Sequence, residues 1–208
     1  TFASPYLQNP LDLGADIVLH SATKYLSGHS DVVLGALIVK DAALNERLAF
    51  IQNSCGAVPG PQDCFLVLRG IKTLHLRMER HCQNGEAIAK WLRTQPKVDR
   101  VLWCGFEDHP NHAIAAKQMR GFGGMISFTQ KGDNVEDALK ILRNTKLFAL
   151  AESLGGVESL IGHPASMTHA SIPAEERAAR GLSDSLIRLS VGVEDVEDLI
   201  EDLRTAMQ

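Results

Sequence analysis

Apolar residues along the chain form two kinds of pattern, short β-branched runs and longer stretches with helical spacing. Near the beginning, residues 17–19 and 32–39 are apolar runs that predict buried strands. A polar, glycine-containing loop over 21–31 separates them. A helix is expected over 41–52 with Asp41 as its N-cap. The sequence therefore begins with strand, loop, strand and helix.

Pro59-Gly60-Pro61 breaks the chain after this helix, and a long helical pattern follows over 62–94. Gly70 and Gly85 interrupt that pattern, which allows two helices in place of one. Further along, strands are expected over 98–103, 124–129 and 187–191, and helices over 112–119, 135–143 and 195–207. The last helix begins with acidic residues, which the helix dipole favours. This alternation predicts an α/β fold.

Composition and charge narrow the class of protein. The 208 residues are 45% hydrophobic and 22% charged, with a formal net charge of −4, which is typical of a soluble globular protein. Lys and Arg form no block, so we expect neither nucleic acid nor a membrane as a partner. The chain opens on Thr1 in a stretch typical of the middle of a fold. We therefore expect the natural amino terminus to lie upstream.

The four cysteines predict neither a disulfide framework nor a zinc ribbon, because they are irregularly spaced and form no CxxC pair. We expect reduced, mostly buried thiols in a cytoplasmic protein. Candidate metal ligands are His109 and His112 near Cys104, with His163 and His169 further along the chain. No HExxH motif is present and His-Pro-Asn-His is typical of a loop, so we expect no metal.

The sharpest candidate for chemistry is the segment HSATKY, in which Ser21 and Thr23 precede Lys24 directly after an apolar strand. Such hydroxyls can bind a phosphate, and a lysine amine can form a Schiff base. It is not a P-loop, because GxxxxGK[ST] is missing. On its own the segment is equally compatible with a solvated lysine whose neighbours make local turn bonds.

Three other segments are candidates, each with a plainer alternative. Paired glycines in ESLGGVESL, residues 152–160, allow close backbone approach to a ligand, although they also suit a simple turn. Residues 163–169 could line a pocket or form a loop. Arg188 lies in an apolar run, where a buried guanidinium needs a partner and a substrate carboxylate would suit its fork. Alternation in that run also allows Arg188 to face water.

Four segments together resemble the Cys/Met-metabolism family of pyridoxal-phosphate (PLP) enzymes, which includes cystathionine γ-lyases, γ-synthases and β-lyases and methionine γ-lyases. They are ADIVLHSATKYLSGHSDVVLGA, QNSCGAVPGPQDCFLVLRGIKTLHLRM, ESLGGVESLIGHPASMTHASIP and LSDSLIRLSVGVEDVEDLIEDL. They fall in the family's order and cover nearly all of the chain. The resemblance implies a fold-type-I, aspartate-aminotransferase-like fold, of which this is the carboxy-terminal portion. Residues 1–60 would end the large PLP-binding domain, and 61–208 would form a connecting helix and the carboxy-terminal α/β domain.

The resemblance also implies roles for individual residues. Lys24 would hold PLP as a Schiff base and, once freed and neutral, remove the substrate α-proton. Ser21 and Thr23 would bind the cofactor phosphate, and Arg188 the substrate α-carboxylate. Ser153 would lie beside the cofactor and that carboxylate, and Glu152 would face the distal part of the substrate.

Other parts of the family's site have no counterpart in this sequence. The acidic residue for the pyridine nitrogen, the ring that stacks on PLP and the glycine turn on the phosphate all lie upstream of Thr1 in the family. An arm from a neighbouring subunit completes the phosphate site. The resemblance implies a cytoplasmic homotetramer built of dimers that share active sites, acting on a small amino acid.

Within the family, Leu154 argues against β-lyases, which are expected to carry Trp there, and Glu152 argues against methionine γ-lyases. Two activities remain, γ-elimination of L-cystathionine to cysteine, 2-oxobutanoate and ammonia, which we favour, and γ-replacement on an O-acylhomoserine with cysteine. A non-catalytic fragment that only packs against partner subunits is the rival outside the enzyme class.

Overall fold

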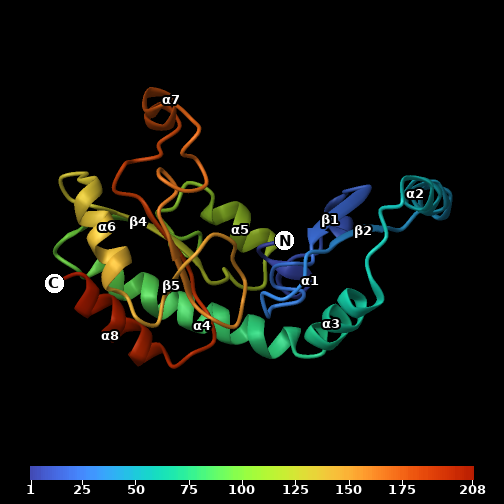
Figure 1. The fold of residues 1–208 in the computed structure, drawn as a ribbon, viewed down its shortest axis with the longest axis horizontal. Coiled ribbons are helices and arrows are strands. Elements are labelled where there is room, and N and C mark those ends of the chain that lie inside the picture. The colour runs from blue at the N-terminus through green and yellow to red at the C-terminus, as the bar shows by residue number, and fades with distance from the viewer.

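The computed structural model describes residues 1–208 and contains two separate β-sheets (Figure 1). The first is a two-stranded antiparallel sheet of β1 (Ile17–Ser21) and β2 (Gly35–Val39). Two short elements precede it, α1 (Ser4–Leu7) and the 3-10 helix η1 (Pro10–Leu13). Ser21 therefore ends a strand, which places the HSATKY segment at the point where the chain leaves this sheet.

Three helices connect the two sheets: α2 (Ala42–Cys55), α3 (Pro61–Ile71) and α4 (Leu74–Arg93). The Asp41 side chain accepts a hydrogen bond from the Leu44 amide at 2.7 Å, which confirms the predicted N-cap. Figure 1 shows α2 and α3 on the side of the small sheet, while α4 runs along the large one. The long helix α4 thus spans from the first sheet to the second.

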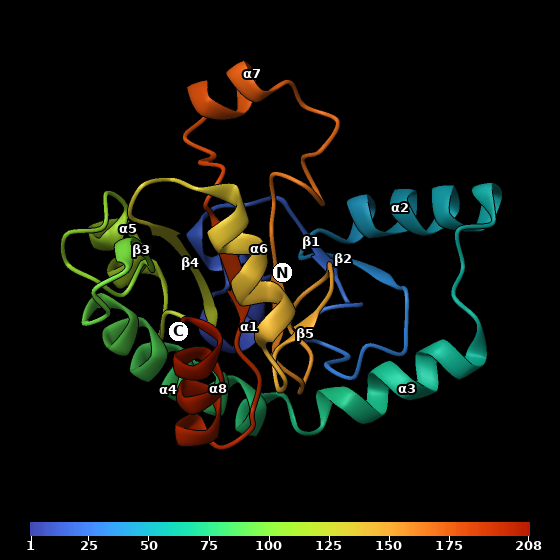
Figure 2. The ribbon, with the colours of Figure 1, turned by 60° about the vertical axis from the view of Figure 1, so that its left-hand side comes forward.

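The second sheet has five strands in the order β3-β4-β7-β6-β5, all antiparallel except the β5–β6 pair. Its strands are β3 (Val98–Leu102), β4 (Met125–Gln130), β5 (Ala149–Leu150), β6 (Leu160–Gly162) and β7 (Ile187–Ser190). The remaining helices are α5 (His112–Gln118), α6 (Val135–Asn144), α7 (Ala174–Ala179) and α8 (Val196–Ala206). In Figure 2, α7 projects from the body on a long loop.

The main hydrophobic core lies between one face of this sheet and the helices α4, α6 and α8. Ile126 and Phe128 of β4 and Ile187 and Leu189 of β7 point into it. Because successive side chains of a strand point to opposite faces, Arg188 projects from the other face. The core packing therefore fixes the direction of this arginine.

The predicted elements are confirmed, with ends that differ from the prediction by at most three residues. The strand expected from residue 32 begins at Gly35, because Val32 turns inward to pack with Ala22 and Val67. The pattern over 62–94 forms two helices, as its glycines allow, and the break at 72–73 follows Gly70, whereas Gly85 lies inside α4. A Cβ on Gly85 would lie 2.6 Å from the Gly123 carbonyl oxygen, so glycine there permits close packing inside α4.

Periodicity did not reveal five short elements, α1, η1, β5, β6 and α7. The expectation of mostly buried cysteines is wrong, since Cys55 is exposed and the other three are half-buried. All four are free thiols. None of the helices is both long and apolar enough to cross a membrane.

Candidate active site

Lys24 lies in a short helical turn that begins where β1 ends. The Lys24 amide donates to the Ser21 carbonyl at 3.2 Å, and the Gly28 amide donates to the Lys24 carbonyl at 2.8 Å. Gly28 has a φ of +75°, a conformation that favours glycine at the end of a helical turn. The turn therefore has a fixed start and a fixed end around the half-buried Lys24.

The two predicted phosphate ligands differ in their surroundings. The Thr23 hydroxyl oxygen accepts a hydrogen bond from the Leu34 amide at 3.0 Å, which ties the turn to the chain just before β2. The Ser21 hydroxyl has no hydrogen-bond partner within the chain, while the Ser21 amide donates to the Thr1 hydroxyl at 3.0 Å. Ser21 is thus free to bind a ligand, whereas Thr23 already has a structural contact.

The second predicted segment, residues 152–160, lies against the Lys24 turn. The Val157 amide donates to the Gly28 carbonyl at 2.9 Å. Gly155 has a φ of +79°, and a Cβ there would lie 2.8 Å from the Tyr25 amide nitrogen. Its glycine is therefore required by contact with the protein and not by a ligand. Ser153 has a φ of +75°, which is uncommon for a residue with a side chain.

Ser153 brings together the two predicted residues from distant parts of the chain. The Lys24 amine, Nζ, donates to the Ser153 hydroxyl at 2.6 Å. The Arg188 guanidinium donates to the Ser153 carbonyl through Nη2 at 2.8 Å. The unusual backbone of Ser153 therefore directs its hydroxyl to an amine and its carbonyl to a guanidinium. The structure places Lys24, Ser153 and Arg188 in one chain of contacts.

Arg188 is half-buried, and its electrostatic surroundings show why it can receive an anion. Burial lowers the pKa of its guanidinium, and the negative charge of Glu152 opposes that shift. Both residues line a small hollow beside His163. Arg188 forms no ion pair with any carboxylate of the chain. Its charge is therefore available for a carboxylate brought by a ligand.

A recess of about 470 Å³ lies beside Ser153, which lines it together with Thr23, Glu152, Glu158 and residues 30–33. Lys24 and Arg188 reach this recess only through their contacts with Ser153. Volumes of this order hold small ligands. Leu154, by contrast, is buried in a core cluster with Tyr25 and Met78 and does not line the recess. The identity of residue 154 therefore bears on packing under the site.

Residues 163–169 contribute one wall of the small hollow, and His163 is fixed within it. Its Nδ1 lies 2.7 Å from the Ser166 hydroxyl, and its Nε2 lies 2.7 Å from the Asp184 carbonyl. Both ring nitrogens are thus used in structural hydrogen bonds. His163 consequently shapes the hollow beside Arg188 and is not positioned as a free acid or base.

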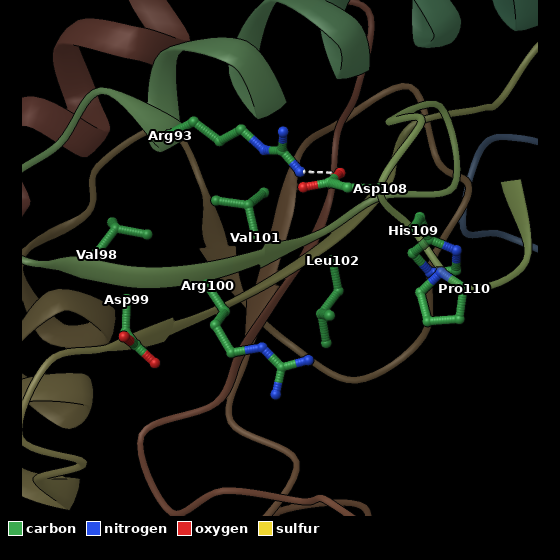
Figure 3. Close-up of a pocket in the computed structure, with 9 residues that line it drawn as sticks. All are labelled: Arg93, Val98, Asp99, Arg100, Val101, Leu102, Asp108, His109 and Pro110. Atoms are coloured by element: carbon green, nitrogen blue, oxygen red, sulfur yellow. Dashed lines mark hydrogen bonds and ion pairs between the residues drawn. The ribbon is translucent and has the colours of Figure 1, made fainter.

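Another recess, of about 350 Å³, lies along the edge strand β3 and contains none of the predicted site residues (Figure 3). Arg93 and Asp108 form an ion pair there at 2.5 Å, and the guanidinium of Arg93 also lies 3.4 Å from the centre of the Phe106 ring. Arg93 and Asp108 therefore neutralise each other, while Asp99 and Arg100 of the same recess form no ion pair.

His109 and His112, the paired candidates for metal ligands, make backbone contacts. His112 Nδ1 lies 2.9 Å from the Cys104 carbonyl, and His109 Nδ1 accepts from the Asn111 amide at 3.2 Å. No group of three or more His, Cys, Asp or Glu side chains in the chain is arranged to hold a metal ion.

Arg77 is a residue near the site that sequence reasoning missed. It is buried with 6% of its surface exposed and donates to the Tyr25 carbonyl at 2.7 Å. A signal was available, because Arg77 lies next to Met78 on the side of α4 that Leu74 and His81 also occupy, all four being buried. A charged residue on the buried face of an amphipathic helix needs partners.

Comparisons with known proteins identify the family and the fold. The family described as Cys/Met metabolism PLP-dependent enzyme matches residues 1–208. The chain is 59% identical to a cystathionine gamma-lyase of Dictyostelium discoideum and 57% identical to a cystathionine beta-lyase of Coxiella burnetii, and each match covers 100% of this chain. A solved structure of cystathionine gamma synthase from Xanthomonas oryzae in complex with cystathionine has a TM-score of 0.95, with 52% identity over 100% of this chain.

The same comparisons show how much of these relatives the chain represents. It covers 53% of the Dictyostelium protein, 54% of the Coxiella protein and 53% of the Xanthomonas chain. The chain thus spans about half the length of the relatives it matches. These relatives include two lyases and a synthase, so the resemblance supports the transsulfuration group and does not separate its reactions.

Proposed function

The chain belongs to the Cys/Met-metabolism family of PLP-dependent enzymes, and from this we propose that it carries the catalytic lysine of a carbon–sulfur lyase that eliminates the γ-substituent of L-cystathionine. The products are cysteine, 2-oxobutanoate and ammonia. The observation that supports the proposal is the Ser153 contact pair, in which the Lys24 amine and the Arg188 guanidinium both bind one residue. This arrangement brings a base and a carboxylate-binding group to one residue that lines the recess.

The residues around the recess suit PLP. Lys24 forms no ion pair with a carboxylate, so its amine is available to hold the aldehyde group. The partnerless Ser21 hydroxyl is available for the phosphate, and Thr23 would join it by turning its hydroxyl proton away from the Leu34 carbonyl, 3.5 Å away. When bound, PLP supplies an electron sink for negative charge at the substrate α-carbon.

The chain's own residues then divide the work. Arg188 binds and orients the α-carboxylate through charge-assisted hydrogen bonds. The Lys24 amine accepts the α-proton and can return a proton to a nearby atom of the substrate. The Ser153 hydroxyl fixes the direction in which that amine points. Glu152, exposed at the rim of the recess, attracts the distal ammonium of cystathionine. Cleavage of the Cγ–S bond releases cysteine.

The γ-replacement reaction is the second candidate, favoured by the likeness to the Xanthomonas cystathionine gamma synthase. The two reactions use the same base and the same carboxylate site. They differ in the group that leaves, and in whether cysteine enters. We propose, as the family resemblance implies, a cytoplasmic homotetramer whose dimers share active sites. We likewise propose the division into 1–60 and 61–208.

A product assay tests this proposal. The protein that carries this chain, loaded with PLP, is given L-cystathionine, and the products are identified by mass spectrometry. We expect 2-oxobutanoate and cysteine. Pyruvate and homocysteine would mean β-elimination, and cystathionine made from O-succinylhomoserine and cysteine without 2-oxobutanoate would mean γ-replacement. Either result would contradict the proposed reaction.

Lys24→Ala tests the role of the lysine itself. The variant should lose turnover and should no longer give a borohydride-reducible PLP adduct at this peptide, while its fold is unchanged by circular dichroism. Lys40→Ala is the matched control, because Lys40 follows β2 and pairs with Asp12 at 2.7 Å away from the recess. An adduct that persists in Lys24→Ala would overturn the assignment.

A further inference from the structure

The helical turn that carries Lys24 is too short to satisfy its own backbone. The Ser27 amide donates to the Ala22 carbonyl at 2.9 Å and the Gly28 amide to the Lys24 carbonyl at 2.8 Å, after which the turn ends. The carbonyls of Tyr25 and Leu26 therefore receive no further amide of the turn. Unpaired carbonyls at a helix end need another donor when they are buried.

Arg77 of α4 supplies those donors. Its Nη1 donates to the Tyr25 carbonyl at 2.7 Å, and its Nη2 donates to the Leu26 carbonyl at 3.3 Å. The same Nη2 donates to the Gly70 carbonyl of α3 at 2.8 Å, and Nε donates to the Thr73 hydroxyl at 3.1 Å. One planar guanidinium thus joins the Lys24 turn to two helices.

Two glycines make this junction possible. A Cβ on Gly70 would lie 2.2 Å from the Ser27 carbonyl oxygen, so α3 ends directly against the turn. A Cβ on Gly28 would lie 2.2 Å from Nη1 of Arg77. Because backbone atoms surround the guanidinium on these sides, the turn has little room to move without breaking its contacts to Arg77.

The partners of Arg77 are all neutral. It forms no ion pair with any carboxylate of the chain, and burial lowers the pKa of its guanidinium. A buried charge held only by carbonyls and one hydroxyl is costly to keep for packing alone. Its five fixed N–H donors, however, can hold several carbonyls in one geometry.

We propose that Arg77 is a positioning residue, which fixes the turn after Lys24 and thereby directs the Lys24 amine toward Ser153. Arg77 does not line the recess. It acts through its hydrogen bonds to the carbonyls of Tyr25 and Leu26. This role rests on the proposed function of Lys24 and adds to it a residue that determines where the amine points.

The test compares Arg77→Met, Arg77→Lys and a control in the protein that carries this chain. Methionine keeps an unbranched apolar side chain but removes every donor, and lysine keeps the charge without the fork. Arg80→Met is the control, because Arg80 lies on the same helix and makes one long contact, 3.5 Å from Nη2 to the Glu194 carbonyl. Hydrogen exchange without cofactor is measured at the Ser27 and Gly28 amides, with α6 and α8 as internal references.

We expect exchange at Ser27 and Gly28 to become about tenfold faster or more in Arg77→Met, since the local turn opens more readily. Exchange in α6 and α8 should be unchanged. Borohydride trapping of PLP on Lys24 should be slower in the same variant, and Arg77→Lys should restore part of both effects. Arg80→Met should behave like the parent protein.

Unchanged exchange at Ser27 and Gly28 in Arg77→Met would overturn the proposal, as would equal acceleration throughout α6 and α8. If Arg77→Met does not fold, the same two measurements are made on Arg77→Lys, namely exchange at Ser27 and Gly28 and exchange in α6 and α8. The exchange measurement needs no cofactor, so its result does not depend on whether PLP binds Lys24. A failure of the Lys24 assignment and a failure of the Arg77 proposal are therefore distinguishable.

Discussion

Lys24 and Ser153 are 129 positions apart in the sequence, and the amine of the first donates to the hydroxyl of the second at 2.6 Å. Ser153 holds this position with a φ of +75°, a region in which a side chain is disfavoured by roughly 1–2 kcal/mol. The same residue offers its carbonyl to Arg188 at 2.8 Å. The strained backbone of Ser153 thus presents its hydroxyl to Lys24 and its carbonyl to Arg188.

Substitutions at Ser153 can separate the strain from the contact. Ser153→Gly removes the hydroxyl and relieves the backbone, so it should be more stable to urea than Ser153→Ala by about 1 kcal/mol. Both variants lose the hydroxyl that fixes Lys24, so both should show a similarly reduced kcat. Equal stability of the two variants would contradict the assigned backbone strain, and a normal kcat would contradict the role of the hydroxyl.

Substitution of Arg188 tests the carboxylate site. Arg188→Lys keeps a positive charge but loses the planar fork, and we expect a loss of about 2 kcal/mol or more in transition-state binding, measured as kcat/KM. Substrate analogues without the α-carboxylate should be affected little. Arg143→Lys, in the last turn of α6, is the control. Equal losses for both kinds of substrate would instead indicate that Arg188 mainly holds the Ser153 carbonyl.

Burial of His81 predicts a pH-dependent stability. Desolvation lowers the pKa of this histidine to about 4, and the nearby charge of Arg77 acts in the same direction, while the hydrogen bond to the Val191 carbonyl opposes it. Its Nδ1 lies 2.7 Å from that carbonyl, and its buried Nε2 has no partner. A proton on Nε2 would therefore create a buried charge with an unpaired donor.

The sign follows from linkage. An unfolded histidine titrates near 6.5, so between about pH 6.5 and 4 the unfolded chain binds the proton and the folded chain does not. The stability from neutral His81 is complete above pH 6.5 and is lost as the pH falls toward 4, by about 3 kcal/mol in all. Urea unfolding at pH 7.5 and 5 should show a smaller pH dependence in His81→Phe than in the parent. His75 is exposed on the same helix, so His75→Gln should leave the pH dependence of the unfolding free energy unchanged. If His81→Phe shows the same pH dependence as the parent, the prediction is refuted.

The sequence predicted long elements well because their patterns are local. The predicted N-cap at Asp41 is confirmed, and the closing helix α8 has the predicted acidic start, with Glu197 and Asp198 in its first turn. The two-residue strand β5 and the three-residue strand β6 are too short to show a period. Their pairing depends on partners that lie elsewhere in the chain, so the pattern of the segment itself does not contain it.

The candidate site was predicted as separate segments, and their meeting depends on tertiary packing. The residue types at Lys24, Ser153 and Arg188 indicated chemistry, but no spacing relates residues so far apart. The paired glycines allow either a ligand or a simple turn, and the structure shows that Gly155 packs on Tyr25. Arg77 was passed over because its partners are backbone carbonyls, which every residue offers and no sequence motif marks.

Glu152 should determine which amino acid the recess prefers. It is exposed at the rim and near enough to Arg188 for its charge to oppose the lowering of the arginine pKa. Cystathionine carries a distal ammonium that methionine and homocysteine lack, so an acid at this position should attract cystathionine selectively. One charge pair in a partly wet site supplies roughly 1–3 kcal/mol, a factor of about 5 to 150.

Glu152→Val should therefore lower kcat/KM for cystathionine much more than for homocysteine or methionine. Activity on the two smaller substrates should stay constant or rise, because an unpaired carboxylate is removed from the path of an apolar side chain. Glu175→Val on α7 is the control, since Glu175 is exposed and lies outside the recess. The measurement is steady-state kinetics of each variant on all three substrates. If every substrate loses activity alike, Glu152 shapes the turn from Ser153 to Gly156 and does not select the substrate, and the preference for cystathionine loses its main support.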